Sequence, residues 1–254
     1  MTDAPNPIAL KTVLYDLPGT ADVTVVPGVV YRTATDGPLV LDLYYPPGDE
    51  PRPAVVIAAG FSDLGFARVV GCRFKDMGSS VSWARLIAAS GLVAVTYTNR
   101  EPLSDLEAVL AYVRSNAASL RIDGDRIALW ASSGNGPAAL SAVMSAPLSC
   151  AVLCYPYTLD VPPAAAKVGF ATTPRPVEDL PPVPLFIARA GRDEMPALNE
   201  SLDRFIAAAL ARNLPITVVN QPEAPHAFDL YVDGDGTRSV VRQILEFLKS
   251  HLAR

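Results

Sequence analysis

Histidine, cysteine and positive charge are scarce in this sequence, and so are long apolar runs. Of 254 residues, two are histidine and three are cysteine, and the formal net charge is −5 at pH 7. The acidic balance argues against nucleic-acid binding, which requires a basic surface patch. No apolar run approaches the roughly 18 residues that a membrane span requires. We therefore expect neither a nucleic acid nor a membrane as a partner.

The few cysteines and histidines also limit metal and redox chemistry. Cys72, Cys150 and Cys154 make an odd number, and residues 1–7 carry no basic and apolar leader. Both features favour the reducing cytoplasm as the location of the protein. With only two histidines the sequence offers no set of metal ligands, and it contains neither a dinucleotide-binding glycine motif nor a phosphate-binding loop. We expect no metal and no cofactor.

What the sequence does contain is apolar runs that alternate with helical patterns. The runs expected to form strands are 22–30, 39–45, 54–59, 92–97, 127–130, 150–155, 185–188 and 216–219. Between the later runs, apolar residues recur at i, i+3, i+4 and i+7, which is typical of amphipathic helices. Asp36 and Gly37 indicate an antiparallel hairpin with a connection longer than the minimum. Ser104 and Glu107 form a capping box that predicts the start of a helix.

This order of elements predicts an α/β fold. A mostly parallel central sheet should carry antiparallel N-terminal strands and helices on both faces. Residues 1–20 are expected to wrap the surface, and the stretch after Phe61 is expected to be irregular. The proline-rich segment 157–184 is long enough to be functional, as a small cap or as a passive crossover. No linker interrupts the chain, so we expect a single domain over residues 1–254.

One stretch changes from strand to helix within a few residues. The apolar run 127–130 is followed by Ala-Ser-Ser-Gly-Asn-Gly and then by a small-residue helical pattern over 137–146. A strand that turns directly into a helix exposes the turn residue at the carboxyl edge of the sheet, which is the geometry of a nucleophile elbow. An ordinary joint with serine caps is the alternative.

Two serines compete for this turn. The turn requires small side chains two residues on either side of the nucleophile, because strand and helix close on each other there. Ser133 has Ala131 and Asn135 at these positions, whereas Ser132 would have Trp130 on one side. Ser133 is therefore the favoured nucleophile.

A carboxylate and a histidine follow two later strands. Asp193 comes after the run 185–188, and His226 comes after the run 216–219. Because active groups of such sheets gather at the carboxyl ends of strands, we expect both residues to meet Ser133. A serine hydroxyl needs a neighbouring base such as imidazole, and a carboxylate can orient that imidazole and stabilise its charged form.

Other residues could take these two roles. Glu194 and Asp160 are alternatives to Asp193 as the carboxylate. The second histidine, His251, falls at the end of the terminal helical pattern, where the helix dipole favours a solvated imidazole. His226 is therefore the expected base of a serine mechanism.

Backbone donors and pocket walls can also be assigned. Gly134 follows the nucleophile and Phe61 follows the run 54–59, so their N–H groups are the expected oxyanion hole. Gly60 would let the backbone approach the substrate closely. Phe66 and Phe170 are expected, with Phe61, to form the walls of a pocket for apolar groups.

Together these motifs resemble the α/β-hydrolase superfamily, and within it the dienelactone-hydrolase-like and small carboxylesterase branch. The residues that carry the resemblance are 130–136, 190–193 and 225–229, read as Trp-Ala-Ser-Ser-Gly-Asn-Gly, Ala-Gly-Arg-Asp and Pro-His-Ala-Phe-Asp. The resemblance implies the α/β-hydrolase fold and a serine hydrolase that cleaves small carboxylic esters through an acyl-enzyme on Ser133. Serine replaces the nucleophilic cysteine of dienelactone hydrolase itself, and Asn135 replaces a usual glycine.

Two further readings fit the same residues. An amide, peptide or lactone could be the substrate, or the chain could be a catalytically inactive hydrolase fold that binds a ligand. The sequence leaves the acyl-chain preference and the oligomeric state open.

Overall fold

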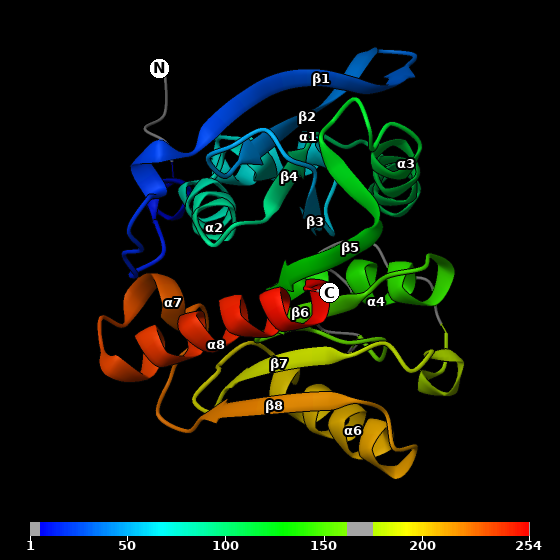
Figure 1. Cartoon of the computed structure of the whole chain (residues 1–254). Coiled ribbons are helices and arrows are strands. Elements are labelled where there is room, and N and C mark those ends of the chain that lie inside the picture. The colour runs from blue at the N-terminus through cyan, green and yellow to red at the C-terminus, as the bar shows by residue number, and fades with distance from the viewer. Residues whose placement is uncertain (1–5, 162–174, 254) are drawn as a thin grey trace.

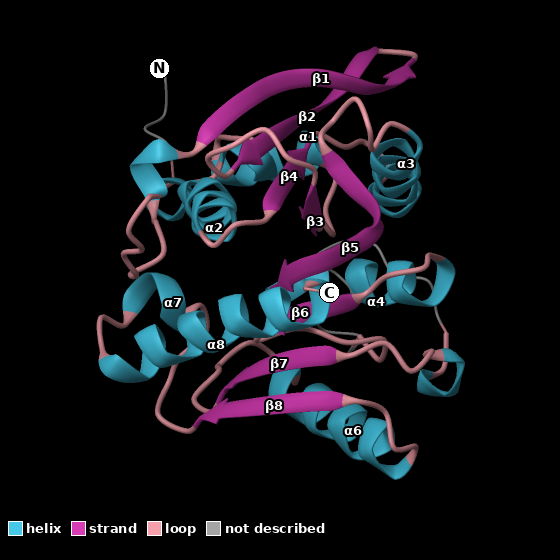
Figure 2. Cartoon of the chain, in the orientation of Figure 1, coloured by secondary structure: helices cyan, strands magenta, loops and turns pink. Residues whose placement is uncertain are grey.

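A sheet of eight strands forms the centre of the structure, a computed structural model that describes residues 6–161 and 175–253 (Figures 1 and 2). The strands are β1 (Thr24–Ala34), β2 (Gly37–Tyr45), β3 (Arg52–Ile57), β4 (Val93–Tyr97), β5 (Ile122–Ser132), β6 (Cys150–Cys154), β7 (Leu185–Ala190) and β8 (Ile216–Gln221). Their order in the sheet is β1-β2-β4-β3-β5-β6-β7-β8. Strand β2 pairs antiparallel with β1 and β4, and the remaining pairs are parallel, which confirms the predicted sheet.

Helices cover both faces of this sheet (Figure 1). They are α1 (Asp63–Val70), α2 (Gly78–Ala89), α3 (Pro102–Ser115), α4 (Gly136–Ser145), α6 (Leu198–Ala211), α7 (Phe228–Tyr231) and α8 (Asp235–Leu252). Short 3₁₀ helices lie at η1 (Pro7–Leu10), η2 (Thr20–Asp22), η3 (Phe74–Asp76), η4 (Ser133–Asn135) and η5 (Val177–Asp179).

Cross-strand neighbours show which helices share a face. Trp130, Val152 and Phe186 are aligned across β5, β6 and β7, so their side chains lie on one face. Trp130 contacts Trp83 of α2 at 4.8 Å between ring centroids, and Phe186 contacts Phe247 of α8 at 5.5 Å. Helices α2 and α8 therefore cover the same face, and Figure 1 shows α4 and α6 behind the sheet.

The central strands are buried on both faces, as their uninterrupted apolar runs predict. Every residue of β4 and of β6 is buried. Cys150 and Cys154 belong to β6, and both are free thiols. Burial raises the pKa of Cys150 to about 12, so this thiol stays protonated and packs as a small apolar side chain.

The segment before β1, which the sequence predicts to wrap the surface, is fixed to the rest of the fold by backbone hydrogen bonds. The amide of Val13 donates to the Ser82 hydroxyl at 3.0 Å, and the amide of Leu14 donates to the Asp229 carbonyl at 2.8 Å. These bonds use backbone groups, which leave no periodic signal in the sequence. The segment thus joins α2 to α7.

Helix α1 was not predicted, because its buried side carries a carboxylate and its exposed side carries aliphatic residues. Its first residue, Asp63, is buried and accepts hydrogen bonds from the amides of Phe74 and Asn99, each at 3.0 Å. Its apolar residues Leu64 and Val69 are exposed, whereas Val70 is buried and Phe66 packs against the core. A short helix with a carboxylate on its buried side and aliphatic side chains in solvent shows only a weak apolar periodicity.

Two local predictions about element ends were wrong. Helix α3 begins after Glu101, and the carboxylate of Asp105 accepts hydrogen bonds from the amides of Arg100 and Glu101 at 2.7 and 2.8 Å. The predicted cap, Ser104, therefore lies inside the helix. The hairpin between β1 and β2 is also tighter than predicted, because Ala34 pairs directly with Gly37.

The joint between β5 and α4 is packed against the chain that follows β6. A Cβ atom on Gly136 would lie 2.2 Å from the Tyr157 carbonyl oxygen and 2.8 Å from the Pro156 Cβ. The amide of Tyr157 in turn donates to the Ser133 carbonyl at 3.0 Å. The small residue that this turn requires is therefore Gly136, three positions after Ser133.

We expect Gly136→Ala to lower the free energy of unfolding by about 1–3 kcal/mol, because backbone atoms block the added methyl group. Gly65→Ala is the matched control: Gly65 is also helical, and nothing lies within 4 Å of its added Cβ. That variant should be unchanged or more stable by up to about 1 kcal/mol. Urea unfolding measures both, and equal stability of the two variants would contradict the packing argument.

Candidate active site

Ser133 occupies the turn between β5 and α4 in a strained backbone conformation. Its φ is +53°, in a region that residues other than glycine rarely adopt. Ser132, by contrast, ends β5 in an extended conformation with φ −133°. The structure therefore places Ser133 at the turn, which is the serine that the small Ala131 favoured.

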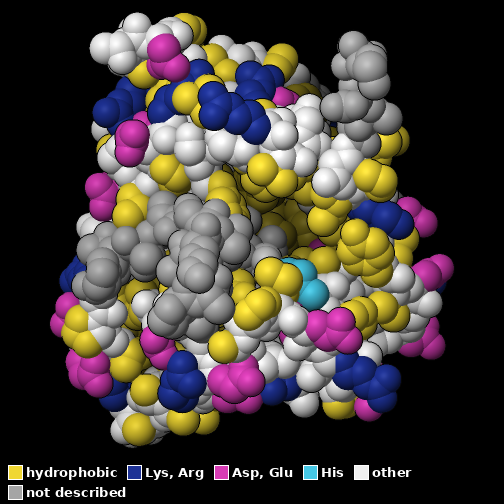
Figure 3. Space-filling view, turned by 180° about the vertical axis from the view of Figure 1, so that it is seen from behind, with side chains coloured by type: hydrophobic (Ala, Val, Ile, Leu, Met, Phe, Trp, Pro, Cys, Tyr) yellow, Lys and Arg dark blue, Asp and Glu magenta, His cyan; other side chains and the backbone are white. Residues whose placement is uncertain are grey.

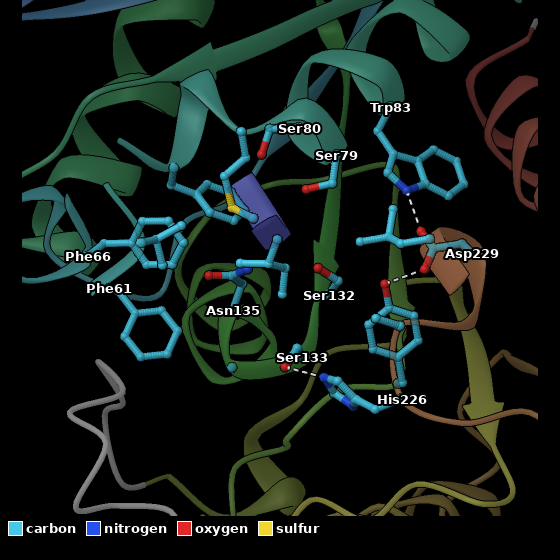
Figure 4. Close-up of a pocket in the computed structure, with 18 of the residues that line it drawn as sticks. Phe61, Phe66, Ser79, Ser80, Trp83, Ser132, Ser133, Asn135, His226 and Asp229 are labelled. Carbon is cyan, nitrogen blue, oxygen red and sulfur yellow. Dashed lines mark hydrogen bonds between the residues drawn. The ribbon is translucent and has the colours of Figure 1, made fainter. Parts of the chain in front are cut away.

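A chain of hydrogen bonds joins three of the predicted residues. The Ser133 Oγ lies 2.9 Å from His226 Nε2 (Figure 4). His226 Nδ1 in turn lies 2.6 Å from Asp193 Oδ2. The other carboxylate oxygen, Oδ1, accepts a hydrogen bond from the amide of Met195 at 2.9 Å. The Asp193 side chain is 0% exposed and the His226 side chain 25%. The Asp193 carboxylate is thus shielded from solvent, whereas the His226 imidazole is partly exposed to solvent.

The loops after β7 and β8 are fastened to each other, and this sets the position of Asp193 relative to His226. The amide of Gly191 donates to the Gln221 carbonyl at 2.8 Å, and the amide of Arg192 donates to the Ala224 carbonyl at 2.9 Å. A Cβ on Gly191 would lie 2.3 Å from the Pro222 carbonyl oxygen, so only glycine fits this approach.

The alternative residues are engaged elsewhere. Asp160 pairs with Arg204 at 2.5 Å, and Glu194 is exposed. His251 lies in the last turn of α8, where its Nδ1 is 2.9 Å from the Phe247 carbonyl oxygen. Neither carboxylate reaches His226 in place of Asp193.

Asn135 joins the turn at Ser133 to the loop after β3, a role that the sequence did not reveal. Its side-chain oxygen accepts a hydrogen bond from the amide of Gly60 at 2.7 Å, and the residue is buried. A Cβ on Gly60 would lie 2.5 Å from the Gly134 carbonyl oxygen. Gly60 therefore packs against the turn itself, and Asn135 fixes the loop that carries Phe61.

A cavity of about 170 Å³ opens beside Ser133. Phe61, Phe66 and Gly134, which the sequence assigned to the site, belong to its lining. Ring contacts at 6.1 Å join Phe61 to Phe66, and at 5.8 Å join Phe66 to Phe74. Figure 3 shows the hollow from outside, with hydrophobic side chains around it and a histidine at its edge. Phe170 lies outside the described residues, as do all of residues 162–174 within the segment 157–184, so both assignments stay predictions.

The opposite wall of the cavity carries polar side chains. Figure 4 shows Ser79 and Ser80 on the first turn of α2, Ser132 on β5 near Ser133, and Asp229 beside Trp83. The sequence did not single out any of these as pocket residues except Ser132, which it considered as a nucleophile. Their elements are far apart in the chain, and only the fold brings them together.

Asp229 anchors the rear of the site. Its carboxylate accepts hydrogen bonds from the Trp83 indole at 2.8 Å and from the Tyr155 hydroxyl at 2.6 Å. The Tyr155 ring meets the His226 ring edge-on at 4.9 Å. Burial raises the pKa of Asp229 above its ordinary value even though both hydrogen bonds favour the charged form. A signal for Asp229 exists in the sequence, because it is the one carboxylate within the apolar stretch 227–232.

Comparison with models of known protein families and with curated protein sequences gives no match. Solved structures do match. Esterase LipW from Mycobacterium marinum has a TM-score of 0.69 at 20% identity, covering 92% of this chain and 83% of LipW. Thermogutta terrifontis esterase 2, phosphorylated by paraoxon, has a TM-score of 0.67 at 20% identity, covering 94% of this chain and 97% of that chain. MGS-M1, an α/β-hydrolase enzyme from a Medee basin deep-sea metagenome library, has a TM-score of 0.69 at 17% identity, with 91% and 99% covered.

The chain has the α/β-hydrolase fold. This confirms the fold that the sequence motifs predict, whereas the narrower likeness to the dienelactone-hydrolase-like branch stays a prediction. Within residues 6–161 and 175–253, no helix is long and apolar enough to cross a membrane. The same residues contain no group of three or more histidine, cysteine, aspartate or glutamate side chains arranged to hold a metal ion.

We expect Asn135→Ala to lower the free energy of unfolding by about 1–3 kcal/mol, because the buried amide of Gly60 loses its acceptor. Asn99→Ala is the matched control: Asn99 is equally buried, but its side-chain amide has no hydrogen-bond partner. Urea unfolding should show the smaller loss for Asn99→Ala, and hydrogen exchange should show faster exchange of the Gly60 amide only in Asn135→Ala. Equal losses in both variants would refute the role of Asn135.

Proposed function

We propose that the protein is a serine hydrolase that cleaves small carboxylic esters, and that residues 1–254 form one catalytic domain. The observation that carries the proposal is the hydrogen-bonded chain Ser133–His226–Asp193, with its serine on a strained turn at the carboxyl edge of the sheet. These are the parts that nucleophilic acyl transfer requires.

In the proposed reaction, Ser133 Oγ attacks the ester carbonyl carbon while His226 Nε2 takes its proton. The buried Asp193 stabilises the imidazolium that forms. The developing oxyanion accepts hydrogen bonds from the backbone amides of Phe61 and Gly134, which border the same cavity. His226 returns the proton to the leaving alcohol, and an acyl-enzyme on Ser133 remains. Water then attacks the acyl carbon while His226 Nε2 takes its proton. As the bond to Ser133 Oγ breaks and the acid leaves, His226 returns that proton to Ser133 Oγ.

Several observations favour ester hydrolysis over the alternative functions. Two of the matching structures are esterases, one of them phosphorylated by paraoxon. The intact hydrogen-bonded chain supports an enzyme over a catalytically inactive binding protein. Amides and lactones remain the second candidate class, because acyl transfer to Ser133 would open them in the same way. The three free cysteines support the proposal that the protein works in the cytoplasm.

The size of the cavity supports a short acyl group. An apolar cavity of about 150 Å³ engineered in another protein accommodates benzene. The cavity here, at about 170 Å³, would hold a group of comparable size. We therefore propose esters of small acids as substrates, in line with the small carboxylesterase branch.

Ser133→Ala should lower kcat/KM for p-nitrophenyl butyrate by at least about 1,000-fold, because no other hydroxyl replaces the nucleophile. Ser132→Ala is the control, since it removes the neighbouring hydroxyl but leaves the hydrogen bond to His226; its kcat/KM should exceed that of Ser133→Ala by at least about 100-fold. Steady-state hydrolysis of the ester measures both. If Ser132→Ala were the inactive variant, the assignment of the nucleophile would be wrong.

A further inference from the structure

The polar wall of the cavity contains hydrogen-bonding groups that the proposed reaction does not use. Figure 4 shows the Ser79 and Ser80 hydroxyls directed from the first turn of α2 into the cavity, on the side opposite Ser133. Ser80 is 2% exposed, and its Oγ has no hydrogen-bond partner. Trp130 also lines the cavity, and its buried indole N–H likewise has no partner.

Unpaired buried donors of this kind are uncommon, because each loses its hydrogen bonds to water without replacing them. The position of Ser80 at the N-terminus of α2 further favours an acceptor oxygen beside it. Helix α2 has 12 residues, and its N-cap, Met77, provides no side-chain acceptor for the free amides of the first turn. The N-terminal end of a helix carries partial positive charge. The wall at Ser80 is therefore suited to an oxygen that accepts hydrogen bonds.

The charge of that oxygen follows from its surroundings. Asp229 lies in the same cavity and would oppose a second carboxylate. No lysine or arginine is among the described residues that line the cavity. The nearby Lys75 is engaged by Asp42 and by Asp76, the latter at 2.9 Å. A neutral oxygen fits this wall, whereas a carboxylate would lose its hydration without gaining a cation.

We propose that the enzyme selects acyl groups that carry a neutral acceptor oxygen, an ether or a ketone, which binds the Ser80 hydroxyl at the N-terminus of α2. This inference rests on the proposed ester hydrolysis and specifies its substrate class. The apolar side of the cavity, with Phe61 and Phe66, receives the carbon atoms of the same acyl group. An acyl group of hydrocarbon alone would leave the Ser80 hydroxyl unpaired in the complex, so it should react more slowly.

Matched substrates test the proposal. p-Nitrophenyl pentanoate is compared with its two analogues in which an oxygen replaces a chain CH₂, the ethoxyacetate and the 3-methoxypropanoate esters. Each kcat/KM is divided by the rate constant for alkaline hydrolysis of the same ester, which removes differences in intrinsic reactivity. We expect at least one oxygen analogue to exceed the pentanoate by about tenfold, the value of one hydrogen bond. A corrected ratio near one for both analogues would overturn the proposal without any variant.

Variants then assign the donor. Ser80→Ala should reduce the corrected ratio to near one, whereas Ser82→Ala should keep it, because the Ser82 hydroxyl bonds the Val13 amide on the outer side of the same helix. If Ser79→Ala removes the preference for the oxygen analogue and Ser80→Ala keeps it, the assignment of the donor to Ser80 is overturned. If the mono-p-nitrophenyl ester of glutaric acid, which carries a carboxylate, reacts faster than both neutral analogues, the proposal that the bound oxygen is neutral is overturned. Ser133→Ala separates the two proposals: if it hydrolyses all the esters at wild-type rates, the proposed function itself fails.

Discussion

The site depends on one strained backbone position. Ser133 has a φ of +53°, a conformation that costs about 1–3 kcal/mol for residues other than glycine. Contacts on both sides hold it: the amide of Tyr157 donates to its carbonyl, and the Asn135 side chain binds the amide of Gly60. These contacts offset the cost of the strained conformation. The turn directs the Ser133 hydroxyl toward His226 and the cavity. Without this turn, the strand ends would meet but no hydroxyl would project between them.

Two buried carboxylates support the imidazole in different ways. Asp193 bonds directly to His226 Nδ1, and among the described residues it forms no ion pair with an arginine or a lysine. Asp229 acts at a distance through the Tyr155 ring, which contacts the imidazole edge-on. The charge of His226 in turn favours the ionised form of Asp229. The two carboxylates therefore hold the imidazole in place from two sides, one through a hydrogen bond and one through an aromatic contact.

The sequence predicts the parts of this site that follow from local rules. Apolar runs located the parallel strands, and the residues at three strand ends, Ser133, Asp193 and His226, meet as expected. Prediction failed where a residue's task depends on a partner distant in the chain. Asn135 looked like a departure from a glycine pattern, yet it binds the loop after β3. Helix α1 was missed because its buried Asp63 accepts hydrogen bonds from two remote amides and only Phe66 and Val70 mark its inward side as apolar.

Ser133 is the proposed nucleophile of acyl transfer, and covalent labelling tests this role most directly. The protein would be treated with paraoxon, digested, and the modified peptide located by tandem mass spectrometry. We expect one diethylphosphoryl group per chain, attached to Ser133, with ester hydrolysis lost in step with labelling. A label on Ser132 or on another residue, or ester hydrolysis that persists after complete labelling of Ser133, would contradict it.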